Sequence, residues 1–125
     1  MKNHLKVLIA DNSELMRMIV KGFLYKRVIE PAIFETSNLP DTFTLLKKDT
    51  FDFLLLDINM PLGDSNPETV KEILAIQPNL KVCMFTGNER SAFEQLYIDA
   101  GAIAFIQKDE NLVQSLELAL KMIID

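Results

Sequence analysis

The chain has 125 residues, a formal net charge of −5 and a single cysteine, Cys83. This length predicts one domain over residues 1–125, large enough to bury a core. One cysteine excludes an internal disulfide, and its apolar neighbours favour a buried, unreactive thiol in a reducing cytoplasm. The modest acidity and scattered Lys and Arg residues disfavour direct nucleic-acid binding. The apolar run over 5–10 is too short for a membrane span or a signal peptide.

That first run, over 5–10, predicts a strand, and a segment of helical spacing follows it. Any of Asp11, Asn12 and Ser13 could cap this helix, and Pro31 is expected to end it. The i, i+3 and i+4 spacing predicts a buried helix face formed by Leu15, Met16, Ile19, Val20, Phe23 and Leu24.

Four more strand and helix pairs continue the alternation. The predicted strands cover residues 32–36, 51–57, 81–86 and 102–107, and the predicted helices cover about 39–49, 67–77, 90–100 and 110–123. The strand over 51–57 is expected to be buried on both faces, because its apolar residues do not alternate with polar ones. Five such pairs predict an α/β fold: a doubly wound, five-stranded parallel sheet with helices on both faces.

Polar residues follow four of the predicted strands: Asp11 and Asn12, then Asp57 and Asn59, then Thr86, and finally Lys108. In open parallel sheets, binding sites form outside the carboxyl ends of the strands. One edge of the sheet is therefore expected to collect acids, amides, a hydroxyl and an ammonium group. Taken singly, most of these residues could be a helix cap, a turn or a solvated strand end. Asp57 is the hardest to explain in this way, because it directly follows three leucines.

Together, these groups are of the types that bind a metal ion and take part in phosphoryl transfer. Carboxylates on neighbouring loops repel one another unless a hard cation lies between them, and oxygen ligands suit Mg²⁺. An aspartate beside Mg²⁺ can act as a nucleophile toward a phosphoryl group and form an acyl phosphate. Phosphoryl transfer needs positioning and charge neutralisation, which a metal, a lysine and a threonine can supply.

Four motifs, "LIADNS", "LLLDINMP", "MFTGN" and "GAIAFIQKD", resemble the receiver domain of bacterial two-component response regulators in both content and spacing. The resemblance covers essentially the whole chain. The last motif, with Asp109 in place of the usual proline, is more similar to LuxR-type regulators than to the chemotaxis regulator. The resemblance implies a flavodoxin-like sheet with strand order 2-1-3-4-5. It also implies a signalling domain of the bacterial cytoplasm that is not an enzyme, apart from weak self-dephosphorylation.

The resemblance also implies the chemistry of the site. Asp57 would be the phosphoacceptor, which takes its phosphoryl group from a sensor histidine kinase or a phosphotransfer protein. The Mg²⁺ ligands would be Asp11, Asn12, Asp57 and the backbone carbonyl of Asn59. Asn12 stands where the family usually has a second acid, so we expect Mg²⁺ binding to be weakened but not abolished.

The same comparison implies a switch. Thr86 and Lys108 would contact the new phosphoryl oxygens, and Phe105 would be the aromatic switch residue. The fourth helix, fifth strand and fifth helix would form the switching face and a possible homodimer contact. Phe105 lacks the hydroxyl of a tyrosine, and an ordinary core phenylalanine explains it equally well. Ser65 stands where a glycine is common, which leaves the conformation of its loop open.

Two other functions are consistent with the sequence. The first is a pseudo-receiver, an interaction module that works without phosphorylation because Asn12 replaces a metal-binding acid. The second, an enzyme or flavin protein of similar architecture, ranks lower: Asp57-Ile58-Asn59 is not the Asp-x-Asp of haloacid-dehalogenase phosphatases, and the chain has no Gly-rich phosphate loop. The residues Phe93, Leu96 and Tyr97 form either a partner surface or, on one side, part of the core.

Overall fold

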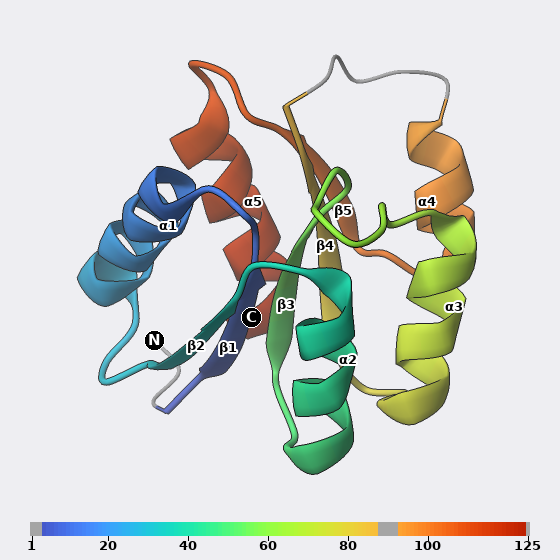
Figure 1. Ribbon diagram of the computed structural model, residues 1–125. Coiled ribbons are helices and arrows are strands. Elements are labelled where there is room, and N and C mark those ends of the chain that lie inside the picture. The colour runs from blue at the N-terminus through green and yellow to red at the C-terminus, as the bar shows by residue number, and fades with distance from the viewer. Residues whose placement is uncertain (1–3, 88–92, 125) are drawn as a thin grey trace.

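The computed structural model describes residues 4–87 and 93–124. Strands and helices alternate along the chain (Figure 1), and their bounds are β1 Lys6–Ala10, α1 Glu14–Arg27, β2 Ala32–Thr36, α2 Leu39–Lys48, β3 Phe53–Asp57, α3 Pro67–Ile76, β4 Lys81–Thr86, α4 Glu94–Ala100, β5 Ala104–Gln107 and α5 Leu112–Ile124. The predicted alternation of strand and helix is confirmed.

The five strands form one parallel sheet in the order β2-β1-β3-β4-β5. In its register Ala10 lies beside Leu56, and Asp57 lies beside Phe85. This confirms the predicted doubly wound, flavodoxin-like α/β fold. The order makes β3 the central strand, and all five of its residues are buried, as its unbroken apolar run predicted.

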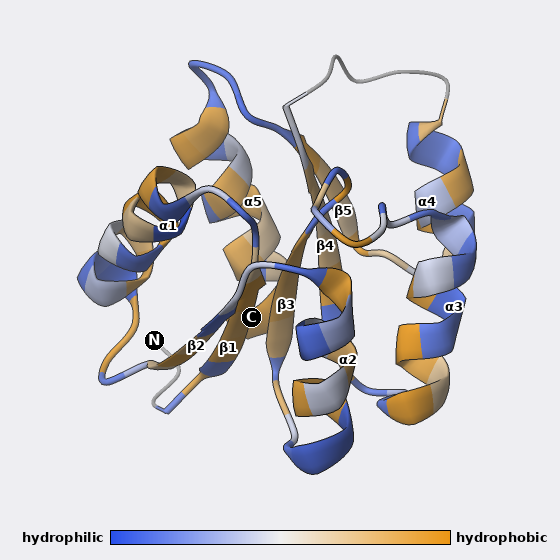
Figure 2. Cartoon of the chain, in the orientation of Figure 1, coloured by the Kyte–Doolittle hydropathy of each residue, from blue (hydrophilic) through white to orange (hydrophobic). Residues whose placement is uncertain are grey.

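Helices cover both faces of the sheet. Helices α1 and α5 lie on one face, and α2, α3 and α4 lie on the other (Figure 1). Successive side chains of β1 alternate between the two: Val7 and Ile9 join the core with α1 and α5, whereas Leu8 and Ala10 join the core with the other three helices. Figure 2 shows a sheet of mainly apolar strands between helices that carry both polar and apolar residues.

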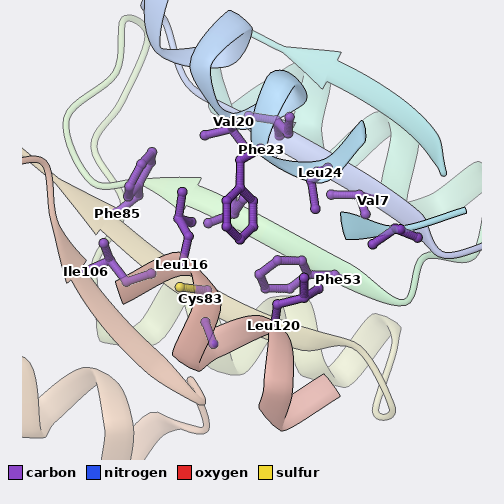
Figure 3. Packing of buried hydrophobic residues seen from close by; sticks show 14 of the residues in the cluster. Val7, Val20, Phe23, Leu24, Phe53, Cys83, Phe85, Ile106, Leu116 and Leu120 are labelled. Atoms are coloured by element: carbon purple, nitrogen blue, oxygen red, sulfur yellow. The ribbon is translucent and has the colours of Figure 1, made fainter. Parts of the chain in front are cut away.

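The core beneath α1 and α5 is built around large side chains from several strands. Phe53 from β3, Phe23 from α1 and Leu116 from α5 converge there, with Cys83 of β4 among them (Figure 3). Cys83 has no exposed surface, and burial raises the pKa of its thiol. The predicted burial of Cys83 is therefore confirmed. The raised pKa of its thiol agrees with the prediction that the residue is unreactive.

The sequence prediction for α1 was wrong in part. Leu15 is 67% exposed and Ile19 is 40% exposed, although both were expected on the buried face. Helix α1 packs Val20, Phe23 and Leu24 against the sheet. Leu15 and Ile19 therefore lie beside this contact and not within it. The helix also ends at Arg27, before Pro31, because Val28 leaves the helix in an extended conformation and is buried.

Some boundaries also differ from the prediction. Strand β3 begins at Phe53 and not at residue 51, because the chain bends at Asp52. The Asp52 carboxylate accepts a hydrogen bond from the Lys6 backbone N–H at 2.8 Å. The expected start of the fourth helix, at about residue 90, falls outside the described residues, and α4 begins at Glu94. None of the helices in the described part of the chain has the length and apolar character needed to span a bilayer.

Candidate functional site

Four strands deliver polar residues to one edge of the sheet, the upper edge in Figure 1. Asp11 follows β1, Asp57 ends β3, Thr86 ends β4 and Lys108 follows β5. The exposed fractions of Asp11, Asp57 and Thr86 are 1%, 3% and 2%. The expected gathering of these four residues at one edge is what the parallel topology produces, because the carboxyl ends of the strands all lie there.

Local hydrogen bonds fix the loop after β1. One carboxylate oxygen of Asp11, Oδ1, accepts from the Ser13 backbone N–H at 2.8 Å. Ser13 is the N-cap of α1, since its hydroxyl accepts from the Met16 N–H at 3.2 Å. Arg17, one turn into α1, donates from Nη1 to the Asp11 carbonyl at 2.5 Å. Asp11 is therefore held at both its side chain and its backbone.

Lys108 joins the two acids. Its ammonium lies 2.7 Å from Asp11 Oδ2 and 3.3 Å from Asp57 Oδ1. Its backbone N–H donates to the Thr86 carbonyl at 2.7 Å, which extends the pairing of β4 and β5 up to the site. The ammonium also lies 5.1 Å from the centre of the Phe85 ring. One positive charge, on a side chain that is 14% exposed, thus faces two buried carboxylates, which leaves the cluster with a net negative charge.

This surplus charge is reflected in the protonation of Asp57. Burial, and then the neighbouring Asp11 carboxylate, raise the pKa of Asp57 to about 6, although the Lys108 ammonium and the Asn59 backbone N–H act in the opposite direction. Burial penalises the charged form of a carboxyl group, and a second negative charge nearby adds to that penalty. A cation bound beside Asp57 would relieve both effects.

The two asparagines of the predicted metal site lie at its rim. Asn12 and Asn59 both have exposed side chains, next to the buried Asp11 and Asp57 in sequence. Within residues 4–87 and 93–124, no three His, Cys, Asp or Glu side chains form a cluster that could hold a metal ion. Two buried carboxylates with amide and backbone oxygens nearby still fit Mg²⁺, which is commonly bound through one or two carboxylates with water completing its shell.

Ser65 joins the two ends of the loop after β3 by hydrogen bonds. These contacts were not predicted from the sequence. Ser65 is buried; its backbone N–H donates to the Ile58 carbonyl at 2.8 Å and its hydroxyl donates to the Asp57 carbonyl at 3.2 Å. The turn between them uses positive φ angles at Leu62 (68°) and Gly63 (132°). A small polar residue at the end of this loop was the available signal, but nothing in its spacing indicated a bond back to Asp57.

Four apolar or aromatic residues on α4 or beside it in the chain or the fold differ in their exposure. Phe105 is 6% exposed and Tyr97 is also 6% exposed, whereas Phe93 is 63% exposed. Of the two readings of the fourth helix, Tyr97 therefore belongs to the core, and Phe93 and the half-exposed Leu96 lie at the surface. The structure places Phe105 as the sequence expected, in a buried strand, and its role in switching stays a prediction.

Known proteins with similar sequences are receiver domains of response regulators. A family model described as "Response regulator receiver domain" matches residues 7–119. The chemotaxis protein CheY of Thermotoga maritima is 35% identical over 105 residues, a match that covers 82% of this chain and 84% of that protein. The residues matched by the family model, 7–119, include the carboxyl ends of all four strands that lead to the site.

Two further matches differ in length from the chain. The transcription regulator BvgA of Bordetella pertussis is 30% identical over 114 residues, which cover 91% of this chain and 54% of BvgA. The chain thus spans about half the length of this relative. A response regulator of Burkholderia pseudomallei, solved with a phosphorylated aspartic acid, a calcium ion and citrate, superimposes with a TM-score of 0.78 at 22% identity, over 93% of this chain and 66% of that one.

Proposed function

Because the chain belongs to the family of response regulator receiver domains of two-component systems, we propose that residues 1–125 form one receiver domain that accepts a phosphoryl group on Asp57. The observation that carries this proposal is the position of Asp57: a buried carboxylate at the end of the central strand, 3.3 Å from the Lys108 ammonium and beside a second buried acid. The phosphorylated aspartic acid of the Burkholderia pseudomallei regulator supports the same chemistry here.

The proposed donor is the phosphohistidine of a sensor kinase or phosphotransfer protein. An oxygen of the Asp57 carboxylate attacks phosphorus, the new O–P bond forms, and the N–P bond to the donor imidazole breaks. The released imidazole nitrogen takes up a proton, and Asp57 becomes an acyl phosphate. Lys108 holds a positive charge next to the oxygens on which negative charge gathers. Hydrolysis of the acyl phosphate would later return Asp57 to its free carboxylate.

The proposed cofactor is Mg²⁺. Asp11 and Asp57 would hold it, with the Asn12 side chain and the Asn59 backbone carbonyl as further oxygen ligands. The metal would supply positive charge that neutralises the incoming phosphoryl group. The raised pKa of Asp57 supports a cation at this position, because the two acids face a single ammonium group.

The proposed output lies on the face formed by α4, β5 and α5, where the contacts made by Thr86 and Phe105 would differ between the two states. This face carries a groove of about 250 Å³ whose lining includes Ile98, Phe105 and Met122. Leu118 and Met122 along it are 66% and 58% exposed. An apolar surface of this kind suits a protein partner, and a homodimer through it is part of the proposal.

The central experiment is incubation with a small phosphodonor and Mg²⁺, followed by intact-mass measurement. We expect a mass increase of one phosphoryl group that is absent in Asp57→Asn. Asp64→Asn is the matched control, because it changes an exposed acid of the same loop. Modification that persists in Asp57→Asn would refute Asp57 as the acceptor.

A second candidate function is the pseudo-receiver. The observation that favours it is that Lys108 already pairs with both carboxylates, while Asn12 contributes no charge. In that case the face of α4, β5 and α5 would bind its partner without modification of Asp57. No mass increase at any Mg²⁺ concentration, together with unchanged partner binding in Asp57→Asn, would support this function over the first.

A further inference from the structure

Helix α4 has few local features that fix its position. It has seven residues, Glu94–Ala100, and its N-cap residue, Phe93, makes no side-chain capping hydrogen bond. Only two of its residues, Tyr97 and Ala100, are buried. A helix this short depends on tertiary contacts rather than on its own hydrogen bonds. Tyr97, the larger of the two buried side chains, is therefore the main anchor of α4.

The hydroxyl of Tyr97 reaches the loop after β3. It donates a hydrogen bond to the Ser65 carbonyl at 3.2 Å, between residues that are 32 positions apart. Burial, and then the Asp64 carboxylate, raise the pKa of Tyr97, so the hydroxyl keeps its proton and remains a donor. The hydroxyl of Ser65 in turn donates to the Asp57 carbonyl at 3.2 Å. Two hydrogen bonds thus connect the backbone of Asp57 to helix α4.

The ring of Tyr97 contacts the residue at the expected switch position. The centres of the Tyr97 and Phe105 rings lie 5.4 Å apart with an angle of 46° between the planes. Both rings are almost fully buried in the same core cluster. Because packed side chains cannot shift independently, Phe105 cannot leave its position without disturbing Tyr97. One side chain therefore touches both the phosphoacceptor loop and strand β5.

We propose that Tyr97 is a positioning residue that couples the Asp57 loop to the α4 and β5 face, through its hydroxyl on Ser65 and its ring on Phe105. Phe105 has no hydroxyl of its own, whereas the Tyr97 hydroxyl of α4 gives this face a polar contact with the loop. The coupling part of this inference rests on the proposed function, since phosphorylation of Asp57 is the event that would be transmitted. The positioning part does not depend on it.

The first experiment tests positioning by hydrogen exchange on the full chain. Tyr97→Phe keeps the ring and removes only the hydroxyl, and Tyr25→Phe makes the same change at a residue that is 61% exposed. We expect exchange in residues 58–66 to become roughly three- to tenfold faster in Tyr97→Phe, the effect of one net hydrogen bond on local opening. Equal exchange in the two variants would overturn the proposal. Both variants keep an aromatic ring, so the fold is preserved for the comparison.

The second experiment tests coupling by spectroscopy. The chain has two tyrosines and no tryptophan, so Tyr25→Phe leaves Tyr97 as its only tyrosine. We expect the tyrosine absorbance of this variant to shift when Asp57 is phosphorylated, because the hydroxyl then changes its hydrogen bond. Full phosphorylation by intact mass with an unchanged spectrum would overturn the coupling and leave the proposed function intact. If no phosphoryl group is found on Asp57, the proposed function fails, and the exchange comparison alone decides the role of Tyr97.

Discussion

Asp57 carries its charge at a position that opposes ionisation. Its carboxylate is buried and faces a second acid, and its pKa of about 6 lies above the usual 3.8. A folded-state pKa above the unfolded value means that the ionised group destabilises the fold at high pH. This destabilisation disappears as the pH falls through about 6 toward the unfolded value.

Replacement of Asp57 by asparagine should therefore stabilise the protein at neutral and higher pH. A shift of this size sets an upper limit of about 3 kcal/mol, and because water reaches the rim of the site we expect about 1 kcal/mol. Urea unfolding at about pH 8 should show this gain, and unfolding at about pH 4 should show almost none. Asp64→Asn controls for the loss of one charge. A gain that is the same at both pH values would contradict the argument.

Asn12 affects the charge of the proposed metal site. Asn12→Asp adds a carboxylate next to Asp11, and the Coulomb attraction to a divalent ion at about 4 Å in water adds up to about 2 kcal/mol. We expect Mg²⁺ to bind up to about 30-fold more tightly, measured by calorimetric titration. Asn66→Asp is the matched control, because it adds the same charge at the N-cap of α3. Equal affinities in the wild type and Asn12→Asp would refute this role for Asn12.

At the scale of single residues, the sequence predicted those parts of the site that follow directly from strand ends. Asp11, Asp57, Thr86 and Lys108 lie where a parallel sheet must place them. Ser65 and Tyr97 could not be found in the same way, because their contacts join segments that are far apart in the chain. Hydrophobic periodicity reports which side of an element is buried, but it carries no information on which hydroxyl meets which carbonyl.

At the scale of the elements, replacing two glycines by alanine is expected to change the free energy of unfolding in opposite directions. Gly101 ends α4 at φ 120°, and a methyl group there would lie 2.4 Å from Leu74 Cδ1 of α3. Gly22 lies within α1, and an added methyl group would meet nothing within 4 Å. Gly101→Ala should therefore cost about 1–2 kcal/mol, whereas Gly22→Ala should gain about 0.5–1 kcal/mol from its helix propensity.

Thermal or urea unfolding of the two variants measures both effects under identical conditions. The variants add the same methyl group, so each serves as the control for the other. A Gly101→Ala variant as stable as the wild type would show that the left-handed conformation at the end of α4 is not required. A destabilised Gly22→Ala variant would show that the exposed side of α1 is more constrained than its surroundings indicate.

The elements themselves were predicted well because the strands are short apolar runs and the helices carry their own boundaries. The third helix was predicted to begin at Pro67, and α3 does begin there, with Asn66 as its N-cap in the structure. The face of α1 was predicted less well. Leu15 and Ile19 fit a helical stripe as well as Val20 does, and only the angle at which α1 packs on the sheet decides between them.

For the whole molecule, the number and type of layers followed from the alternation of strands and helices. The order of the strands did not, because several orders satisfy right-handed crossover connections. The order 2-1-3-4-5 came from the family resemblance and is the order found. The site depends on that order, since it places β3 between β1 and β4 and brings Asp57 next to Asp11.

The position of β3 also predicts a gradient of hydrogen exchange across the sheet. Residues 54–56 are paired on both sides and fully buried, whereas β2 and β5 each pair on one side only. We expect the slowest amides of the protein in β3 and its neighbours, and faster exchange in β2 and β5. Exchange followed by mass spectrometry on peptides from each strand measures this order. Uniform protection across the five strands would contradict it.

This expected gradient means that the strands carrying the residues of the site would open at different rates. Asp57 ends the strand that we expect to open last, and Lys108 follows β5, an edge strand that we expect to open more often. Each brief opening of that edge would withdraw the ammonium from the two acids while the acids themselves stay in place. During those intervals the pocket would be most negative and most open to an arriving cation. The rate at which β5 opens would then set how quickly the proposed metal could enter.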